Sequence, residues 1–162
     1  MMKKLFYFVL IASIALACSE GLESPNSQTV RIDELVFGRF YGMCFGESCV
    51  EIYLVNDEEL LEDTTDNYLF REIFEQDQYL RMSAEKHSIA LELLEEVPIQ
   101  LTQQSNNVYG CPDCHDQGGL HLKIIENGEE RNFRFDLENS ENPDYLRPYL
   151  RKVNQTVDQL AQ

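Results

Sequence analysis

Apolar and polar side chains alternate most clearly over residues 120–136, which read LHLKIIENGEERNFRFD. Asn127-Gly128 in the middle of this segment is a strong signal for a two-residue type I′ turn, because both positions need a positive φ. A turn of this kind sets the register of the two strands and gathers large side chains on one face. The predicted pairs are Leu122 with Phe133 and Leu120 with Phe135. The pattern therefore predicts a β-hairpin.

The spacing changes to that of a helix in residues 142–160. Asn142 is a good N-cap residue and Pro143 suits the first helical position. Pro148 lies further inside, where it is expected to kink or restart the helix. The apolar residues that recur at helical intervals are Leu146, Leu150, Val153, Val157 and Leu160.

The first half of the chain has similar but weaker patterns. Residues 83–98 predict a helix that Ser83 caps and Pro98 ends. The acid-rich stretch 57–66 is expected to form a solvated turn, since it lacks the spacing of a calcium loop. Segments rich in β-branched and aromatic residues predict strands at 29–42, 49–56 and 68–74.

Strands followed by a helix in both halves predict an α+β fold: an antiparallel β-sheet with two helices packed on one face. We expect residues 30–162 to form a single domain, because a chain of 162 residues is long enough for one, and its 43% of hydrophobic residues make a packed core feasible. Both halves also place Tyr-Gly just before a cysteine, at residues 41–44 and 109–111. A decayed ββα duplication is one interpretation. Independent use of Gly and Cys in turns is the other.

The N-terminus has the features of an export signal. Residues 1–17 contain two lysines followed by an apolar run that is too short to span a bilayer. Cys18 comes directly after Ala15-Leu16-Ala17, which predicts a bacterial lipoprotein signal whose cysteine carries acyl chains such as palmitate. Ala-x-Ala also suits ordinary secretion, with Cys18 as a spare thiol. Residues 18–29 are polar and predict the lipidated Cys and a flexible tether.

Charge excludes one class of partner. The chain has 13 Lys and Arg against 29 Asp and Glu, a formal net charge of −16. Binding to nucleic acid requires a basic surface that neutralises phosphates, so no nucleic-acid partner is expected. A solvated acidic surface explains the composition, and binding of cations or of a basic partner stays open.

Four cysteines remain after Cys18, and an even number in an exported chain favours disulfides. Three connectivities are open, two local bridges or either of two crossed arrangements. The four residues are disulfide or metal candidates: Cys44, Cys49, Cys111 and Cys114.

Cys111, Cys114 and His115 form C-x-x-C-H, the pattern that attaches haem c. This alternative would make the protein a c-type electron carrier, with two thioether bonds and His115 as an axial ligand. The motif runs through a Gly-Gly turn into a strand, whereas small c-type cytochromes are helical. The candidates for the second axial ligand are Met43, Met82, His87 and His121.

Two further alternatives use the same thiols. The two cysteine pairs have a spacing from which a zinc-stabilised domain with four cysteine ligands could be built. A thioredoxin-like redox site requires a helix beginning at the first cysteine, and the sequence after Cys114 predicts a turn and a strand. Structural disulfides are the preferred interpretation, each worth about 2–4 kcal/mol. No cofactor is then expected, and Asp113 and Asp116 would hydrogen-bond their own backbone.

Together with the leader, three segments carry a resemblance: YGMCFGESCVEIY, YGCPDCHDQGG and PDYLRPYLRKVNQTVDQL. They resemble small cysteine-containing lipoproteins of the Bacteroidota cell envelope. The resemblance implies a cell-envelope location and supplies no mechanism.

The predicted function is that of a lipid-anchored, non-enzymatic binding or structural module stabilised by disulfides. Its membrane contact would be the lipid on Cys18, and its location the cell envelope, as an outer-membrane lipoprotein. The partner would be another envelope protein.

Overall fold

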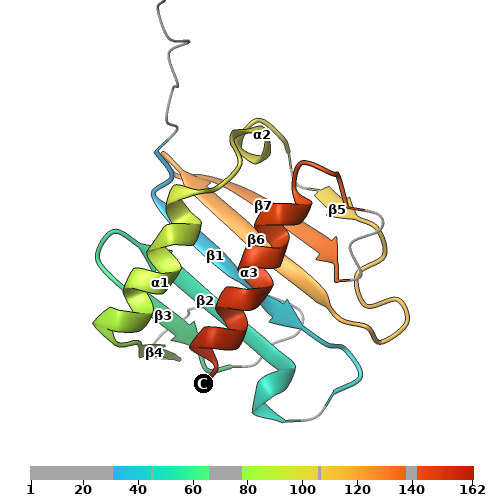
Figure 1. The fold of residues 1–162 in the computed structure, drawn as a ribbon, viewed down its shortest axis with the longest axis horizontal. Helices are drawn as coiled ribbons and strands as arrows, with labels where there is room; N and C mark the ends of the chain where they lie inside the picture. The colour runs from blue at the N-terminus through green and yellow to red at the C-terminus, as the bar shows by residue number, and fades with distance from the viewer. Residues whose placement is uncertain (1–30, 45, 66–77, 106, 138–141) are drawn as a thin grey trace, which may run out of the picture.

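A seven-stranded sheet forms the centre of the fold, with strands in the order β4-β3-β2-β1-β6-β7-β5 (Figure 1). The computed structural model describes residues 31–44, 46–65, 78–105, 107–137 and 142–162. The strands are β1 (Glu34–Phe40), β2 (Val50–Asn56), β3 (Leu60–Asp63), β4 (Tyr79–Arg81), β5 (Asn107–Tyr109), β6 (Gly119–Glu126) and β7 (Glu129–Asp136). The helices are α1 (Ala84–Glu95), α2 (Ile99–Thr102) and α3 (Arg147–Leu160), and η1 (Glu47–Cys49) is a 3-10 turn.

The α+β class is confirmed, but the sheet is mixed rather than antiparallel. β5 runs parallel to β7, whereas the other neighbouring strands are antiparallel. The described residues contain three α-helices where two were expected. The ββα duplication is not confirmed, because β1–β4 precede α1 while β5–β7, with their parallel pair, precede α3.

The predicted hairpin is confirmed in its register. β6 and β7 pair Leu122 with Phe133, and Glu126 faces Glu129 across the turn. Asn127 has φ 52° and Gly128 has φ 79°, the positive values that a type I′ turn requires. Local side-chain alternation and turn chemistry were therefore sufficient to predict this element.

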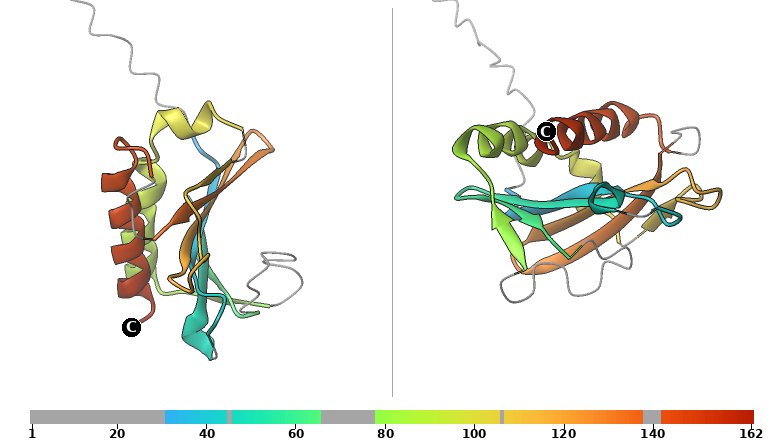
Figure 2. Two further views of the ribbon diagram at one scale, coloured as in Figure 1. Left: turned by 90° about the vertical axis from the view of Figure 1, so that its right-hand side faces the viewer. Right: turned by 90° about the horizontal axis from the view of Figure 1, so that it is seen from below.

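Both faces of the central strands are buried. One face of the sheet packs against α1 and α3, which lie side by side (Figure 2). Leu35 and Phe37 of β1 belong to this larger core, together with Leu93 of α1 and Val153 of α3. The opposite face carries a smaller buried cluster of Val36, Phe40, Val50 and Ile52. Burial on both faces explains why β1 and β2 read as nearly continuous apolar runs.

The helices agree with the prediction at α1 and differ at α3. Ser83 caps α1, accepting a hydrogen bond from the Lys86 backbone N–H at 3.3 Å. The expected start of α3 at Asn142 is wrong, because the Asn142 side chain donates instead to the Asp136 carbonyl oxygen. The helix begins at Arg147, so Pro148 lies in its first turn. A proline there costs no intrahelical hydrogen bond, so the helix can begin beside Pro148 without a kink.

Four short strands and helices were not predicted, namely β3, β4, α2 and β5. β3 lies within the acid-rich stretch expected to be a turn, and α2 follows Pro98, where the chain was expected to leave the helical conformation. β5 has only three residues and no alternating pattern. The strand predicted at 68–74 lies outside the described residues.

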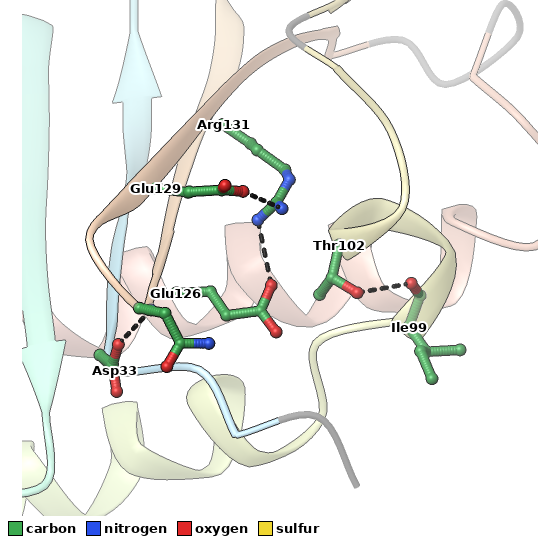
Figure 3. Close-up of polar contacts among 7 residues, drawn as sticks. Asp33, Ile99, Thr102, Glu126, Glu129 and Arg131 are labelled. Carbon is green, nitrogen blue, oxygen red and sulfur yellow. Dashed lines mark hydrogen bonds and ion pairs between the residues drawn. The ribbon is translucent and has the colours of Figure 1, made fainter. Parts of the chain in front are cut away.

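The hairpin turn and the start of β1 form one polar end of the sheet (Figure 3). The Asn127 backbone N–H donates to the Asp33 carboxylate at 2.6 Å. Arg131 joins the two sides of the turn through ion pairs with Glu126 and Glu129, at 3.1 and 2.9 Å. Thr102 of α2 lies nearby and donates to the carbonyl of Ile99. The described chain therefore enters the sheet at the hairpin end.

No helix within the described part of the chain is long and apolar enough to cross a membrane.

His121 is a buried ionisable group in β6, with 4% of its surface exposed. Burial, together with the neighbouring positive charges of Arg134 and Lys123, lowers the pKa of its imidazole to about 3. The unfolded chain therefore binds a proton more readily than the folded chain, so this group's contribution to stability is complete above pH 6.5 and is lost as the pH falls.

We predict that the free energy of unfolding falls by about 2 kcal/mol between about pH 7.5 and pH 5 because of this one residue. Urea denaturation at a series of pH values measures the effect. His121→Gln should flatten this part of the profile, and His115→Gln, the same change at an exposed position, is the matched control. An unchanged slope in His121→Gln would contradict the assignment.

Candidate functional site

The two cysteine-bearing loops lie side by side at the end of the sheet opposite the hairpin turn (Figure 1). One loop, residues 41–49, joins β1 to β2, and the other, residues 110–118, joins β5 to β6. Phe40 at the end of β1 pairs with Val50 on one side and with Gly119 on the other. Strand pairing therefore brings together loops that are far apart in the sequence. We call this region the disulfide end.

Each loop is closed by its own disulfide, Cys44–Cys49 and Cys111–Cys114. Of the three connectivities left open by the sequence, the structure has the two local bridges. The Cα atoms are 5.5 Å apart in both pairs, a usual separation for a disulfide. The bridged residues are separated by 5 and 3 positions, and loops this short contribute about 2 kcal/mol each.

Asp113 connects the two loops without covalent bonds. One carboxylate oxygen accepts the Gly118 N–H at 2.9 Å within its own loop, as expected for a turn residue. The other oxygen accepts the Gly42 N–H of the neighbouring loop at 2.8 Å, a contact that the sequence did not predict. Asp113 has φ 63°, which aspartate tolerates better than most residues. The sequence indicated the role of Asp113 within its own loop, because an aspartate between two cysteines in a Gly-rich turn is expected to bond the nearby backbone.

Tyr41 and Gly118 pack against each other across the same boundary. Gly118 has φ +79°, and a Cβ atom at this position would overlap the Tyr41 ring. The Arg39 guanidinium lies 5.8 Å from the centre of that ring. Arg39 also donates to Asp158 at 2.7 Å, so the loop pair is connected to α3.

The C-x-x-C turn is held by hydrogen bonds around its sulfurs. The Cys114 N–H donates to the Cys111 carbonyl at 3.1 Å, and the Gln117 side chain donates to the same oxygen at 2.9 Å. The Cys111 N–H donates to the Asp136 carboxylate at 3.4 Å. The Asp113 N–H donates to the Gly118 carbonyl at 3.0 Å. None of these bonds uses a sulfur atom.

The two disulfides differ in exposure. Cys111 is exposed and Cys114 lies at the surface of the same turn, whereas Cys49 is 6% exposed and Cys44 is half-buried. The first disulfide is therefore partly packed into the fold, and the second lies at the surface.

The haem and zinc alternatives would both require reduction first, because each of the four thiols is bonded to another cysteine. His115 is exposed, and its backbone N–H donates to the Gln117 side chain. Of the candidate second ligands, His121 is buried in the sheet, Met43 is 76% exposed and His87 contacts the Asn56 carbonyl. Among the described residues, no group of three or more His, Cys, Asp or Glu side chains is arranged to hold a metal ion.

A groove of about 510 Å³ lies near the end of α3. Its polar side chains are engaged within the chain. Tyr53 donates to Glu51 at 2.9 Å, and burial followed by the Glu51 charge raises the pKa of the Tyr53 phenol. Lys86 donates to the Leu160 carbonyl, and Asp63 accepts from the Thr65 backbone at 2.8 Å. We therefore take the disulfide end as the candidate site.

Cys18, the predicted lipidation site, lies outside the described residues. Its modification stays a prediction.

Comparison with known proteins finds no matching family model, no matching curated protein and no matching solved structure. The function of the disulfide end therefore has to be inferred from its own geometry.

The first prediction for this site concerns the contact between Tyr41 and Gly118. Gly118→Ala should lower the free energy of unfolding by about 3 kcal/mol or more, because strain from a positive φ adds to overlap with the ring. Gly128 is a matched control, since it has the same φ of +79° with open space around it. Gly128→Ala should cost only about 1 kcal/mol. If urea denaturation shows that both variants lose the same free energy of unfolding, the two loops do not pack tightly.

The second prediction concerns Asp113. Asp113→Asn places an N–H2 donor against one of two backbone N–H donors and should cost about 1–2 kcal/mol. Asp116→Asn is the matched change, because Asp116 has a similar φ of 61° and is exposed. The free energy of unfolding of Asp116→Asn should stay within about 0.5 kcal/mol of the wild-type value. Thermal or urea unfolding of both variants measures the difference, and a larger loss at Asp116 would contradict the role of Asp113.

Proposed function

We propose that this protein is a lipid-anchored cell-envelope protein, a non-enzymatic binding or structural module that presents its disulfide end to a partner. The observation that carries the proposal is the separation of the two ends of the sheet. The described chain begins beside the hairpin turn, and both cysteine loops lie at the other end (Figure 1).

Contacts of Asp33 support this orientation. Its backbone N–H donates to the Ile125 carbonyl at 2.9 Å, and its carboxylate accepts from Asn127 at 2.6 Å. Asp33, the residue directly before β1, is thus bonded to the hairpin end. β1 then runs for seven residues, about 20 Å, before the first cysteine loop. An anchor on Cys18, joined through residues 19–29, would leave the disulfide end facing away from the membrane.

The disulfides support a location outside the cytoplasm. Such bonds form and persist in oxidising compartments and are rare where thiol reductants are abundant. Two short bridges that brace neighbouring loops fit an exported protein, in agreement with the predicted signal in residues 1–17.

The exposed chemistry of the disulfide end supports binding. Met43 is 76% exposed in the first loop, and such a large apolar side chain suits contact with another protein. The loop carrying it is fixed by Cys44–Cys49 and by the Gly42–Asp113 hydrogen bond. A surface that is ordered before binding loses less conformational entropy when the partner docks.

Expression of the full chain in a Gram-negative host with an alkyne analogue of palmitate tests the anchoring. We expect the wild type to be labelled and to sediment with membranes, because the acyl chains partition into the bilayer. Cys18→Ser should be unlabelled and should appear in the soluble periplasmic fraction.

Ser24→Ala, a change of similar size within the predicted tether, is the matched control and should behave as the wild type. An unlabelled wild type in the soluble fraction would overturn the proposed lipid anchor.

A further inference from the structure

We propose that Cys111–Cys114 is a site of thiol–disulfide exchange with a partner that carries a dithiol, whereas Cys44–Cys49 is a structural bond. This inference goes beyond the proposed function and does not rest on lipid anchoring. It rests on two independent observations about the C-x-x-C turn, namely the exposure of Cys111 and Cys114 and the hydrogen bonds that hold its backbone.

Access distinguishes the two disulfides. Exchange begins when a thiolate attacks one sulfur of the bond, so the rate depends on how easily that sulfur is reached. Cys111 is exposed in the turn after β5, and Cys114 lies at the surface of the same turn. Cys49 is 6% exposed beside the start of β2, and Cys44 is half-buried. The same reagent should therefore reach Cys111–Cys114 before it reaches Cys44–Cys49.

The turn is also held in place without its disulfide. The Asp113 N–H donates to the Gly118 carbonyl at 3.0 Å, and the Asp113 carboxylate accepts from Gly118 and Gly42. The Cys111 carbonyl accepts from Cys114 and from Gln117. Sulfur takes part in none of them, so breaking the S–S bond removes none of these hydrogen bonds directly. The two thiols should then stay close enough to re-form the bond.

This reactivity differs from that of a thioredoxin-like site, which requires a helix where the sequence predicts a turn and a strand. No helix begins at Cys111, so a helix terminus does not activate its sulfur. The site would work through access and through a backbone that keeps two thiols paired.

The chemistry conserves atoms and electrons. A thiolate of the partner attacks one sulfur of Cys111–Cys114, their S–S bond breaks, and the electron pair leaves on the other sulfur, which takes up a proton. The partner's second thiol loses its proton, attacks the partner sulfur of the mixed disulfide and releases the remaining cysteine as a thiol. The partner is oxidised to a disulfide, and Cys111 and Cys114 are reduced with two electrons and two protons.

Timed reduction of the fully oxidised mature protein tests the inference, with dithiothreitol as the dithiol and reduced glutathione as a monothiol. Samples are quenched with acid, alkylated and mapped by peptide mass spectrometry. We expect dithiothreitol to reduce Cys111–Cys114 at least about tenfold faster than Cys44–Cys49, because attack requires access to the sulfur. Reduction of both pairs at the same rate, or of Cys44–Cys49 first, would overturn the proposal.

The glutathione arm tests whether the reduced thiols stay paired. We expect little accumulated adduct, because the neighbouring thiol expels glutathione and closes the bond again. A stable glutathione adduct on Cys111 or Cys114 would show that the turn opens after reduction, against the proposal.

Circular dichroism and thermal unfolding provide a readout of the folded state. The wild type reduced only at Cys111–Cys114 should keep its far-ultraviolet spectrum and a single unfolding transition, and the double variant Cys111→Ala/Cys114→Ala should do the same. The matched double variant Cys44→Ala/Cys49→Ala should retain rapid reduction at the other pair. Should that variant not fold, the rates in the wild type still decide the question. Cooperative unfolding upon selective reduction would assign Cys111–Cys114 a structural role instead.

Discussion

The pairing of β1 with both β2 and β6 is the interaction on which the rest of the structure depends. Residues 34–40 form seven residue pairs on each side, and the partners on one side come from 119–125, far along the chain. A shift of one residue would move Leu35 and Phe37 from the helix-covered face to the other face. This register therefore positions the core and, at the ends of the strands, the loops.

The disulfide end follows from that pairing rather than from the disulfides. Each disulfide is local and closes only the loop in which it lies. The contact between loops is made by Asp113 with Gly42 and by Tyr41 with Gly118. Arg39 extends this network to Asp158 of α3. Covalent bonds thus shape each loop, and hydrogen bonds and packing hold the two loops together.

The two ends of the sheet have different chemistry, and this asymmetry connects the proposals. Charged side chains such as Arg131 and Glu126 surround the hairpin turn, where the described chain begins (Figure 3). The opposite end carries two disulfides, one partly buried and one at the surface. A protein anchored near the hairpin would present the surface disulfide on its far side, where a second protein could reach it.

The sequence by itself determined the elements whose signals are local. It predicted the β6–β7 register, because alternation and Asn127-Gly128 lie within a few residues of each other, and it predicted the Ser83 cap for the same reason. Tertiary structure decided the rest. Asn142 had the features of a helix cap but bonds the Asp136 carbonyl, and the three residues of β5 form a strand only because β7 lies beside them. The Gly42–Asp113 contact joins residues 71 positions apart and depends on long-range strand pairing, which leaves no local pattern in the chain. The number of cysteines left three connectivities open, and the structure has the two local bridges.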